Sequence, residues 1–133
     1  CLLTKPFLGI CLGKQILFDY SEEGESQGLG ILPGKVKRFK KKNAVKIPHM
    51  GWNTVRIRRN HPVFSGIVKN EEEKPYFYFV HSFFSKPDDS RLILGKTMHG
   101  EGFTSVISRE NIFATQFHPE KSSENGIMLL KNF

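Results

Sequence analysis

Two short segments, far apart in the chain, carry the residue types that nucleophilic catalysis requires. In the first, Cys11 stands between Gly9 and Gly13, the G-x-nucleophile-x-G spacing of a nucleophile elbow with sulfur in place of a hydroxyl. Glycines permit a sharp turn from strand to helix, and a cysteine at the helix N-terminus is favoured as its thiolate. A buried structural cysteine between two packing glycines explains the same pentapeptide, so this segment alone leaves both interpretations open.

The second segment supplies a base. His118 and Glu120 follow an apolar run and stand two residues apart, so on an extended chain their side chains project to the same side. An imidazole oriented by a carboxylate, together with Cys11, would form the thiol version of a nucleophile–base–orienter triad. Alone, a His-Pro-Glu segment is typical of a capped surface turn. The presence of both segments in one chain favours catalysis.

The apolar pattern predicts the elements that position these residues. A buried strand over Phe7–Ile10 passes through a tight turn at Cys11 into a helix that extends to about Phe18. A loop is predicted over Ser21–Gly30, and a turn or short helix over His61–Gly66. Further strands are predicted at Gly30–Val36, Val45–Ile47, Thr54–Ile57, Tyr76–Val80, Leu92–Lys96, Phe103–Ser108 and Ile112–Phe117, followed by a terminal helix over about Ser122–Phe133. Helices at both ends of a mostly β chain predict an α/β fold layered around a sheet.

The composition is that of one soluble globular domain. The 133 residues are 38% hydrophobic, and 20 basic against 13 acidic residues give a net charge of +7. Basic residues concentrate in Lys35–Lys46 and Arg56–Arg59, which invites a nucleic-acid interpretation. Solvated strand faces explain most of this charge, and a basic surface facing an acidic protein partner is the main alternative. The aromatic residues fall in apolar strands and are not interleaved with the lysines, which argues against a nucleic-acid stacking platform.

We expect neither a targeting segment nor a metal site in this sequence. No apolar run approaches the length of a membrane span, and the N-terminus lacks the features of a signal peptide, so we expect a cytoplasmic protein. Two cysteines are too few for a disulfide scaffold, which predicts free thiols. The five histidines show no paired ligand spacing, so we expect no metal and no cofactor.

Five segments in the right order resemble the class I, or triad-type, glutamine amidotransferases. Gly9–Gln15 and Phe117–Glu120 look like the two catalytic signatures of that family. Pro48–Asn53, Tyr78–Phe83 and Lys121–Ser122 narrow the resemblance to glutaminase subunits that pass ammonia to a cyclase forming imidazole glycerol phosphate in histidine biosynthesis. The resemblance runs from Pro6 to the C-terminus.

The resemblance implies an α/β three-layer sandwich with a mixed central sheet. In the family the nucleophile elbow lies well inside the chain, whereas only ten residues precede Cys11 here. We therefore expect residues 1–133 to be the C-terminal part of a single amidotransferase domain that is incomplete at its N-terminus. The missing part would hold the second oxyanion donor, and loss of one such donor typically costs about 10²- to 10³-fold in rate.

The resemblance also implies a role for each matching residue. Cys11 would attack the side-chain amide of L-glutamine, His118 would transfer the proton, and Glu120 would orient His118. The implied substrate-binding positions are Leu12, whose N–H would donate to the oxyanion, and Gln15, Glu23, Ser82 and Phe83. The implied contacts with a (β/α)₈ cyclase subunit, in a heterodimer, are Met50, Trp52, Asn53 and Lys121. Phe83 stands where the family has tyrosine, and Trp52 taken alone would fit a core tryptophan.

Three alternatives stay open at this point. The chain could feed ammonia to another synthase, of the anthranilate, aminodeoxychorismate or GMP synthase type. Cys1 could be an N-terminal nucleophile that uses its own amino group as base, although Leu2–Thr4 offers no glycine for close approach. A basic nucleic-acid-binding module is the non-enzymatic alternative. No membrane partner is expected.

Overall fold

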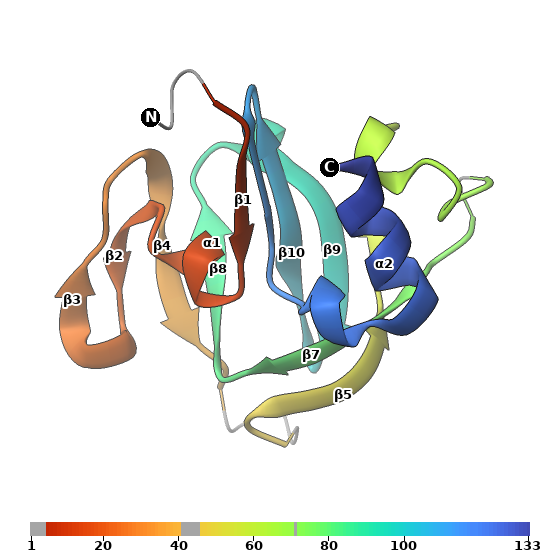
Figure 1. The fold of residues 1–133 in the computed structure, drawn as a ribbon. Coiled ribbons are helices and arrows are strands. Elements are labelled where there is room, and N and C mark those ends of the chain that lie inside the picture. The colour runs from red at the N-terminus through yellow and green to blue at the C-terminus, as the bar shows by residue number, and fades with distance from the viewer. Residues whose placement is uncertain (1–4, 41–45, 71) are drawn as a thin grey trace.

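A curled mixed sheet with few helices makes up the molecule (Figure 1). This computed structural model describes residues 5–40, 46–70 and 72–133. The large sheet is ordered β1-β11-β10-β8-β4-β2-β3, with β9 paired to β10 and β6 paired to β9. Its strands are β1 (Phe7–Ile10), β2 (Phe18–Ser21), β3 (Ser26–Gln27), β4 (Leu32–Arg38), β6 (Arg56–Ile57), β8 (Phe83–Pro87), β9 (Ile93–His99), β10 (Glu101–Arg109) and β11 (Ile112–Thr115).

Two of the strand pairs in this sheet are parallel and the others are antiparallel. β1 runs parallel to β11, and β2 runs parallel to β4. The predicted mixed central sheet is thereby confirmed. The helices are α1 (Leu12–Gln15), α2 (Ser123–Asn132) and the 3₁₀ turns η1 (Glu23–Glu25), η3 (Pro62–Phe64), η4 (Ser90–Leu92) and η5 (Pro119–Lys121). In the described part of the chain, no helix is long and apolar enough to cross a membrane.

A separate two-stranded ribbon, β5 (His49–Thr54) and β7 (Tyr76–His81), crosses one end of the large sheet (Figure 1). Side chains of β7 alternate, with Phe77 and Phe79 fully buried and Tyr76 exposed on the other face. The ribbon is tied to the chain after β11, because the His118 N–H donates to the Tyr78 carbonyl at 2.9 Å. The ribbon therefore lies next to the segment that follows the last strand.

The apolar core divides into two clusters on opposite faces of the sheet. Val106 belongs to the larger cluster and its neighbour Ile107 to the smaller one, as alternation along β10 requires. The larger cluster is rich in phenylalanine, and the rings of Phe77 and Phe117 stack with centroids 4.0 Å apart. Leu129 of α2 is buried in it, so the terminal helix covers this face. This packing holds β7 against the segment that carries His118.

Several predicted elements differ from the observed ones. The first helix ends at Gln15 and not near Phe18, because Phe18 pairs with Leu32 in the parallel β2–β4 ladder. Lys46 and Ile47 lie in no strand, and Val45 is outside the described residues. The predicted loop over Ser21–Gly30 contains η1 and β3. The sequence prediction also missed β5 and β8, since both are defined by pairing with distant strands and not by their own apolar alternation. The terminal helix and the turn at His61–Gly66 are confirmed.

Candidate active site

Cys11 sits on the turn between β1 and α1, as the nucleophile-elbow spacing predicts. Its backbone has φ 53° and ψ −106°, a left-handed conformation that non-glycine residues rarely adopt. Close packing explains Gly9, because a Cβ there would lie 2.7 Å from the Gly13 carbonyl oxygen. The same explanation fails for Gly13, where a Cβ would meet nothing within 4 Å in the described chain. The elbow is therefore present, and only one of its glycines is required by the described contacts.

The parallel pairing of β1 with β11 brings the two predicted catalytic segments to one edge of the sheet. Ile10 is opposite Thr115, and the Cys11 N–H donates to the Thr115 carbonyl at 2.8 Å. The residues that follow both strands therefore leave the sheet at the same end. On the β11 side, His118 Nδ1 lies 2.5 Å from Glu120 Oε1. Because a carboxylate accepts, Nδ1 carries the hydrogen and Nε2 is left as the basic nitrogen.

Gln116 is a site residue that the sequence prediction missed. Its side chain is fully buried, and its Nε2 donates to the Cys11 Sγ at 3.6 Å, while the thiol approaches the Val80 carbonyl oxygen at 3.9 Å. The Gln116 Oε1 is buried and has no partner among the described residues. A signal was available, since Gln116 precedes the His118–Glu120 segment by two residues at the end of a predicted strand.

Burial raises the pKa of the Cys11 thiol above its ordinary value. The hydrogen bond from the Leu12 N–H, that from Gln116, and the positive charge of Lys14 oppose this rise, while Glu23 adds to it. The expected stabilisation of the thiolate by a helix N-terminus does not prevail, because α1 has only four residues and desolvation is the larger effect. A neighbouring base is therefore needed to deprotonate the thiol.

Lys14, three residues after the nucleophile, is completely buried. Its Nζ donates to the Thr104 carbonyl oxygen at 3.1 Å and to the Ser85 hydroxyl. Burial lowers the pKa of this ammonium to about 7, and the charge of Cys11 acts in the opposite direction. Nothing in the sequence distinguishes Lys14 from the exposed lysines, because its environment is made by β8 and β10, which lie far along the chain.

Replacing Lys14 with methionine should change how stability depends on pH. Between about pH 7 and pH 10.5 the unfolded chain keeps the Lys14 proton and the folded chain does not, so the contribution of Lys14 to the free energy of unfolding rises with pH. The slope from this one proton approaches about 1.4 kcal/mol per pH unit. Lys14→Met should remove that increment in urea titrations at pH 7 and pH 9, whereas the exposed control Lys35→Met should keep it. Parallel slopes for wild type and Lys14→Met would show that Lys14 does not titrate in this range.

The residues implied to bind substrate lie around the elbow. Gln15 Nε2 donates to the Phe83 carbonyl at 3.2 Å, which joins α1 to the start of β8. Leu12 is exposed directly after Cys11, and Glu23 of η1 is within electrostatic reach of the thiol. Ser82 is partly buried and its carbonyl accepts from the Phe39 N–H at 3.2 Å. The structure therefore gathers these residues from three segments of the chain, and their roles stay predictions.

Three of the four residues implied to contact a partner lie on β5, and they point to opposite faces of that strand. Met50 and Trp52 point outward, 61% and 53% exposed, and Trp52 packs edge-on against Tyr78 with ring centroids 6.0 Å apart. The core-tryptophan alternative is therefore wrong. Asn53 points the other way and donates to the Met98 carbonyl at 2.8 Å. Lys121 is exposed in η5, next to the ribbon.

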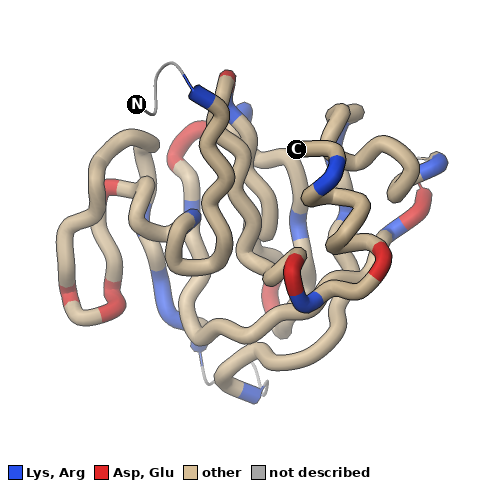
Figure 2. The backbone as a smooth tube through the Cα atoms, viewed as in Figure 1, with Lys and Arg blue, Asp and Glu red and all other residues tan. Residues whose placement is uncertain are grey.

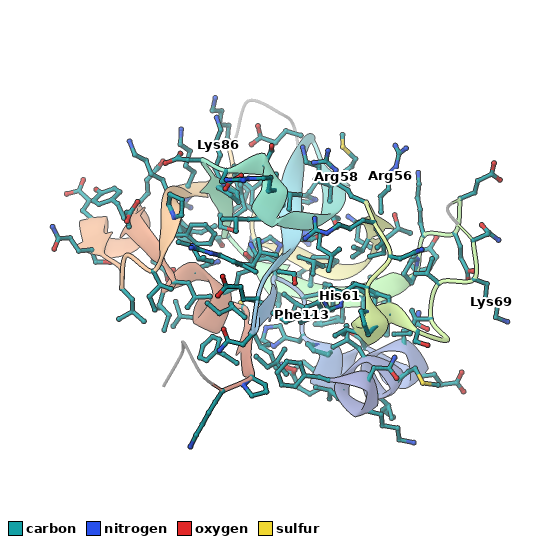
Figure 3. The ribbon with its side chains drawn as sticks, turned by 90° about the horizontal axis from the view of Figure 1, so that it is seen from above. Arg56, Arg58, His61, Lys69, Lys86 and Phe113 are labelled. Carbon is teal, nitrogen blue, oxygen red and sulfur yellow. The ribbon has the colours of Figure 1, made fainter. Side chains whose placement is uncertain are left out.

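The two basic runs line two hollows that share Lys96. Lysine and arginine lie on both the β4 side and the α2 side of the sheet (Figure 2). Arg56 and Arg58, with Lys69 beyond them, line an open hollow of about 760 Å³ (Figure 3). No aromatic side chain is among the described residues that line it. No group of three or more His, Cys, Asp or Glu side chains in the described ranges is arranged to hold a metal ion.

Comparisons with known proteins relate residues 2–133 to the family model "Glutamine amidotransferase class-I". The imidazole glycerol phosphate synthase subunit HisH of Aromatoleum aromaticum is 52% identical over 137 residues, which cover 98% of this chain and 63% of that protein. The HisH subunit of Methanocaldococcus jannaschii is 54% identical over 129 residues, covering 96% of this chain and 62% of that protein. The chain thus spans less than two thirds of the length of these relatives.

Solved structures support the same fold. The structure of PurLQS from Thermotoga maritima superposes with a TM-score of 0.67 at 19% identity, covering 96% of this chain and 59% of that one. A glutamine amidotransferase from the same organism gives a TM-score of 0.61 at 18% identity, with 95% of this chain and 45% of that one covered. The alternative of a nucleic-acid-binding module gains nothing from these comparisons. With the family model matching nearly every residue, this chain belongs to the class I glutamine amidotransferase family.

Proposed function

We propose that this chain carries the glutaminase site of an imidazole glycerol phosphate synthase. The observation that supports this most strongly is the parallel β1–β11 pair, which brings Cys11 and the hydrogen-bonded His118–Glu120 pair to one edge of the sheet. The identity of about one half to HisH subunits favours this synthase over the anthranilate, aminodeoxychorismate and GMP synthase types. The free thiol at Cys11 is consistent with a reducing, cytoplasmic location.

In the proposed reaction, His118 Nε2 takes the proton of the Cys11 thiol, and the thiolate adds to the side-chain carbonyl carbon of glutamine. The oxyanion accepts the Leu12 N–H. Collapse of this intermediate breaks the C–N bond, ammonia leaves with the proton from His118, and a glutamyl thioester remains. His118 then deprotonates a water that attacks the thioester, which releases glutamate and returns the proton to the sulfur. Glu120 keeps the Nδ1–H of His118 in place throughout.

Four further residues belong to the proposed site. Gln15 and Glu23 hold the glutamine, and Ser82 and Phe83 bind its α-amino acid end. The raised pKa of Cys11 accords with this mechanism, because a protonated resting thiol makes His118 necessary. Gln116 orients the sulfur through its 3.6 Å hydrogen bond.

The proposed partner is a (β/α)₈ cyclase subunit that receives the ammonia. Met50 and Trp52 form an exposed apolar face on β5, and Lys121 is exposed in η5, which contacts β7 of the same ribbon, so the surface suits a protein interface with a charged rim. Asn53 contributes by holding β5 to β9 through the Met98 carbonyl.

The proposal is tested by measuring glutamate formation from glutamine by the full-length protein, alone and with its cyclase subunit. We expect hydrolysis that increases when the cyclase carries its nucleotide ligand. An enzyme that forms no glutamate in the presence of the liganded cyclase would overturn the proposed function. A protein that is stimulated equally well by an unrelated synthase subunit would overturn the choice of partner.

A further inference from the structure

Three histidines that are scattered in the sequence converge behind the β5–β7 ribbon. His49 of β5 and His81 of β7 are buried, and the His99 ring of β9 stacks on His49 with centroids 4.0 Å apart. Phe39 and Phe103 pack against the His49 and His81 rings. Burial lowers the pKa of His49 to about 4 and that of His81 to about 3, so both imidazoles are neutral at pH 7.

The hydrogen bonds among these residues have one possible direction. The Phe83 carbonyl only accepts, so the His81 Nδ1–H donates to it at 2.7 Å and His81 Nε2 is an acceptor. His49 Nδ1 lies 2.9 Å from that nitrogen and must therefore donate to it. His49 Nε2 then accepts from the Asn53 amide at 3.1 Å. The second Asn53 N–H donates to the Met98 carbonyl, which fixes the orientation of the amide.

One end of this series of hydrogen bonds lies at the proposed glutamine pocket, and the other end lies on β5, the strand that carries the proposed partner face. At one end, the Phe83 carbonyl also accepts from Gln15 Nε2 at 3.2 Å, within the proposed glutamine pocket. At the other end, Asn53 follows Trp52, whose side chain points outward from β5. Three side chains, Asn53, His49 and His81, therefore connect β5, behind its outward face, to the proposed substrate pocket.

We propose that Asn53, His49 and His81 are positioning residues that hold the Phe83 carbonyl and Gln15 in the geometry that binds glutamine, and that carry movement of β5 to that pocket. Each ring nitrogen of His49 and His81 has one hydrogen-bond partner in this series. Displacing Asn53 therefore leaves His49 Nε2 buried and unpaired unless the two rings move together. Coupling between two sites requires an element that has two arrangements, and in this proposal the linked hydrogen bonds are that element. This inference rests on the proposed function, because it takes the glutamine pocket and the partner face from it.

A spectroscopic measurement on the wild-type protein tests the direction of the chain. In ¹⁵N-histidine-labelled full-length protein at pH 7, His49 and His81 should both be neutral with the hydrogen on Nδ1. His99 should carry its hydrogen on Nε2, because that nitrogen donates to the Lys46 carbonyl at 2.8 Å. An Nε2–H tautomer or an imidazolium at His49 or His81 would overturn the proposal, whether or not any variant folds.

Kinetics of three variants, in complex with the cyclase, test the coupling. His49→Phe keeps a ring in the stack and removes both hydrogen bonds, so the KM for glutamine should rise and the stimulation by liganded cyclase should fall, each by at least about fivefold. His49→Asn keeps a donor at the position of Nδ1 and should recover part of both effects. The control His99→Phe keeps the stack, lies outside the chain of bonds, and should leave both quantities unchanged.

These outcomes separate the inference from the function on which it rests. A wild-type complex without glutaminase activity would contradict the proposed function itself. If the wild-type complex is active and stimulated, and a folded His49→Phe variant matches it in KM and in stimulation, the positioning role is overturned while the proposed function stands. Equal losses in His49→Phe and His99→Phe would also overturn it, because they would point to general packing.

Discussion

In the full-length protein with its cyclase subunit, Cys11→Ala should lower kcat for glutamine hydrolysis by about 10⁴- to 10⁶-fold. His118→Ala should cost a similar factor, and the double variant should lose no more than the worse single one. The reason is that the base has no function without the sulfur, and the sulfur is protonated at rest because burial raises its pKa. Glutamate formation under saturating glutamine measures all three variants.

Glu120→Gln provides the finer test of the same unit. It keeps the shape of the side chain that accepts from His118 Nδ1 and removes the charge, so kcat should fall while the KM for glutamine changes little. If the losses of kcat in Cys11→Ala and His118→Ala were additive in the double variant, the two residues would not share a mechanism. His118 would then be only part of a capped surface turn. Cys1→Ala is the matched control and should retain activity; Cys1 lies outside the described residues.

The second large effect is expected at the partner face. Trp52→Ala should weaken binding of the cyclase subunit by at least about 2 kcal/mol, or roughly 30-fold in Kd, because half-exposed aromatic residues become buried anchors in interfaces. Calorimetric titration of the two subunits measures the change. Since Trp52 is 53% exposed in this structure, the thermal stability of the isolated subunit should hardly change.

A charge-reversal variant controls for non-specific attraction. Lys35→Glu combined with Lys37→Glu alters β4, which pairs with β2 and β8 and not with the ribbon, and should leave Kd nearly unchanged because surface charges contribute little. The opposite pattern, in which Trp52→Ala binds the cyclase normally while nucleic acid binds at physiological salt with a steep salt dependence, would favour the nucleic-acid interpretation of the basic surface.

Sequence reasoning succeeded where local chemistry determines local structure. Gly9 permits the close packing of the elbow. His118 and Glu120 meet as the sequence predicts, although Glu120 lies in the 3₁₀ turn η5 and not on an extended segment. It also anticipated a mixed sheet through the resemblance to the amidotransferase family. These features depend on a few neighbouring residues, so they are visible without any knowledge of the distant parts of the chain.

What could not be predicted depends on contacts between distant parts of the chain. Lys14 looks like a surface lysine until β8 and β10 bury it. His49 and His81 are separated by 32 positions and meet only because β5 pairs with β7. β8 contains Ser85, Lys86 and Pro87, which carry no strand pattern of their own, and its pairing with β4 overrides this weak propensity.

The most direct test of the account is to trap the nucleophile with a glutamine-analogue electrophile and map the modified peptide by mass spectrometry. We predict one adduct per full-length chain, located on Cys11 and absent from Cys11→Ala, because its sulfur is the nucleophile that the elbow presents at the edge of the sheet where β1 and β11 end. An adduct that persists in Cys11→Ala and disappears in Cys1→Ala would contradict the account.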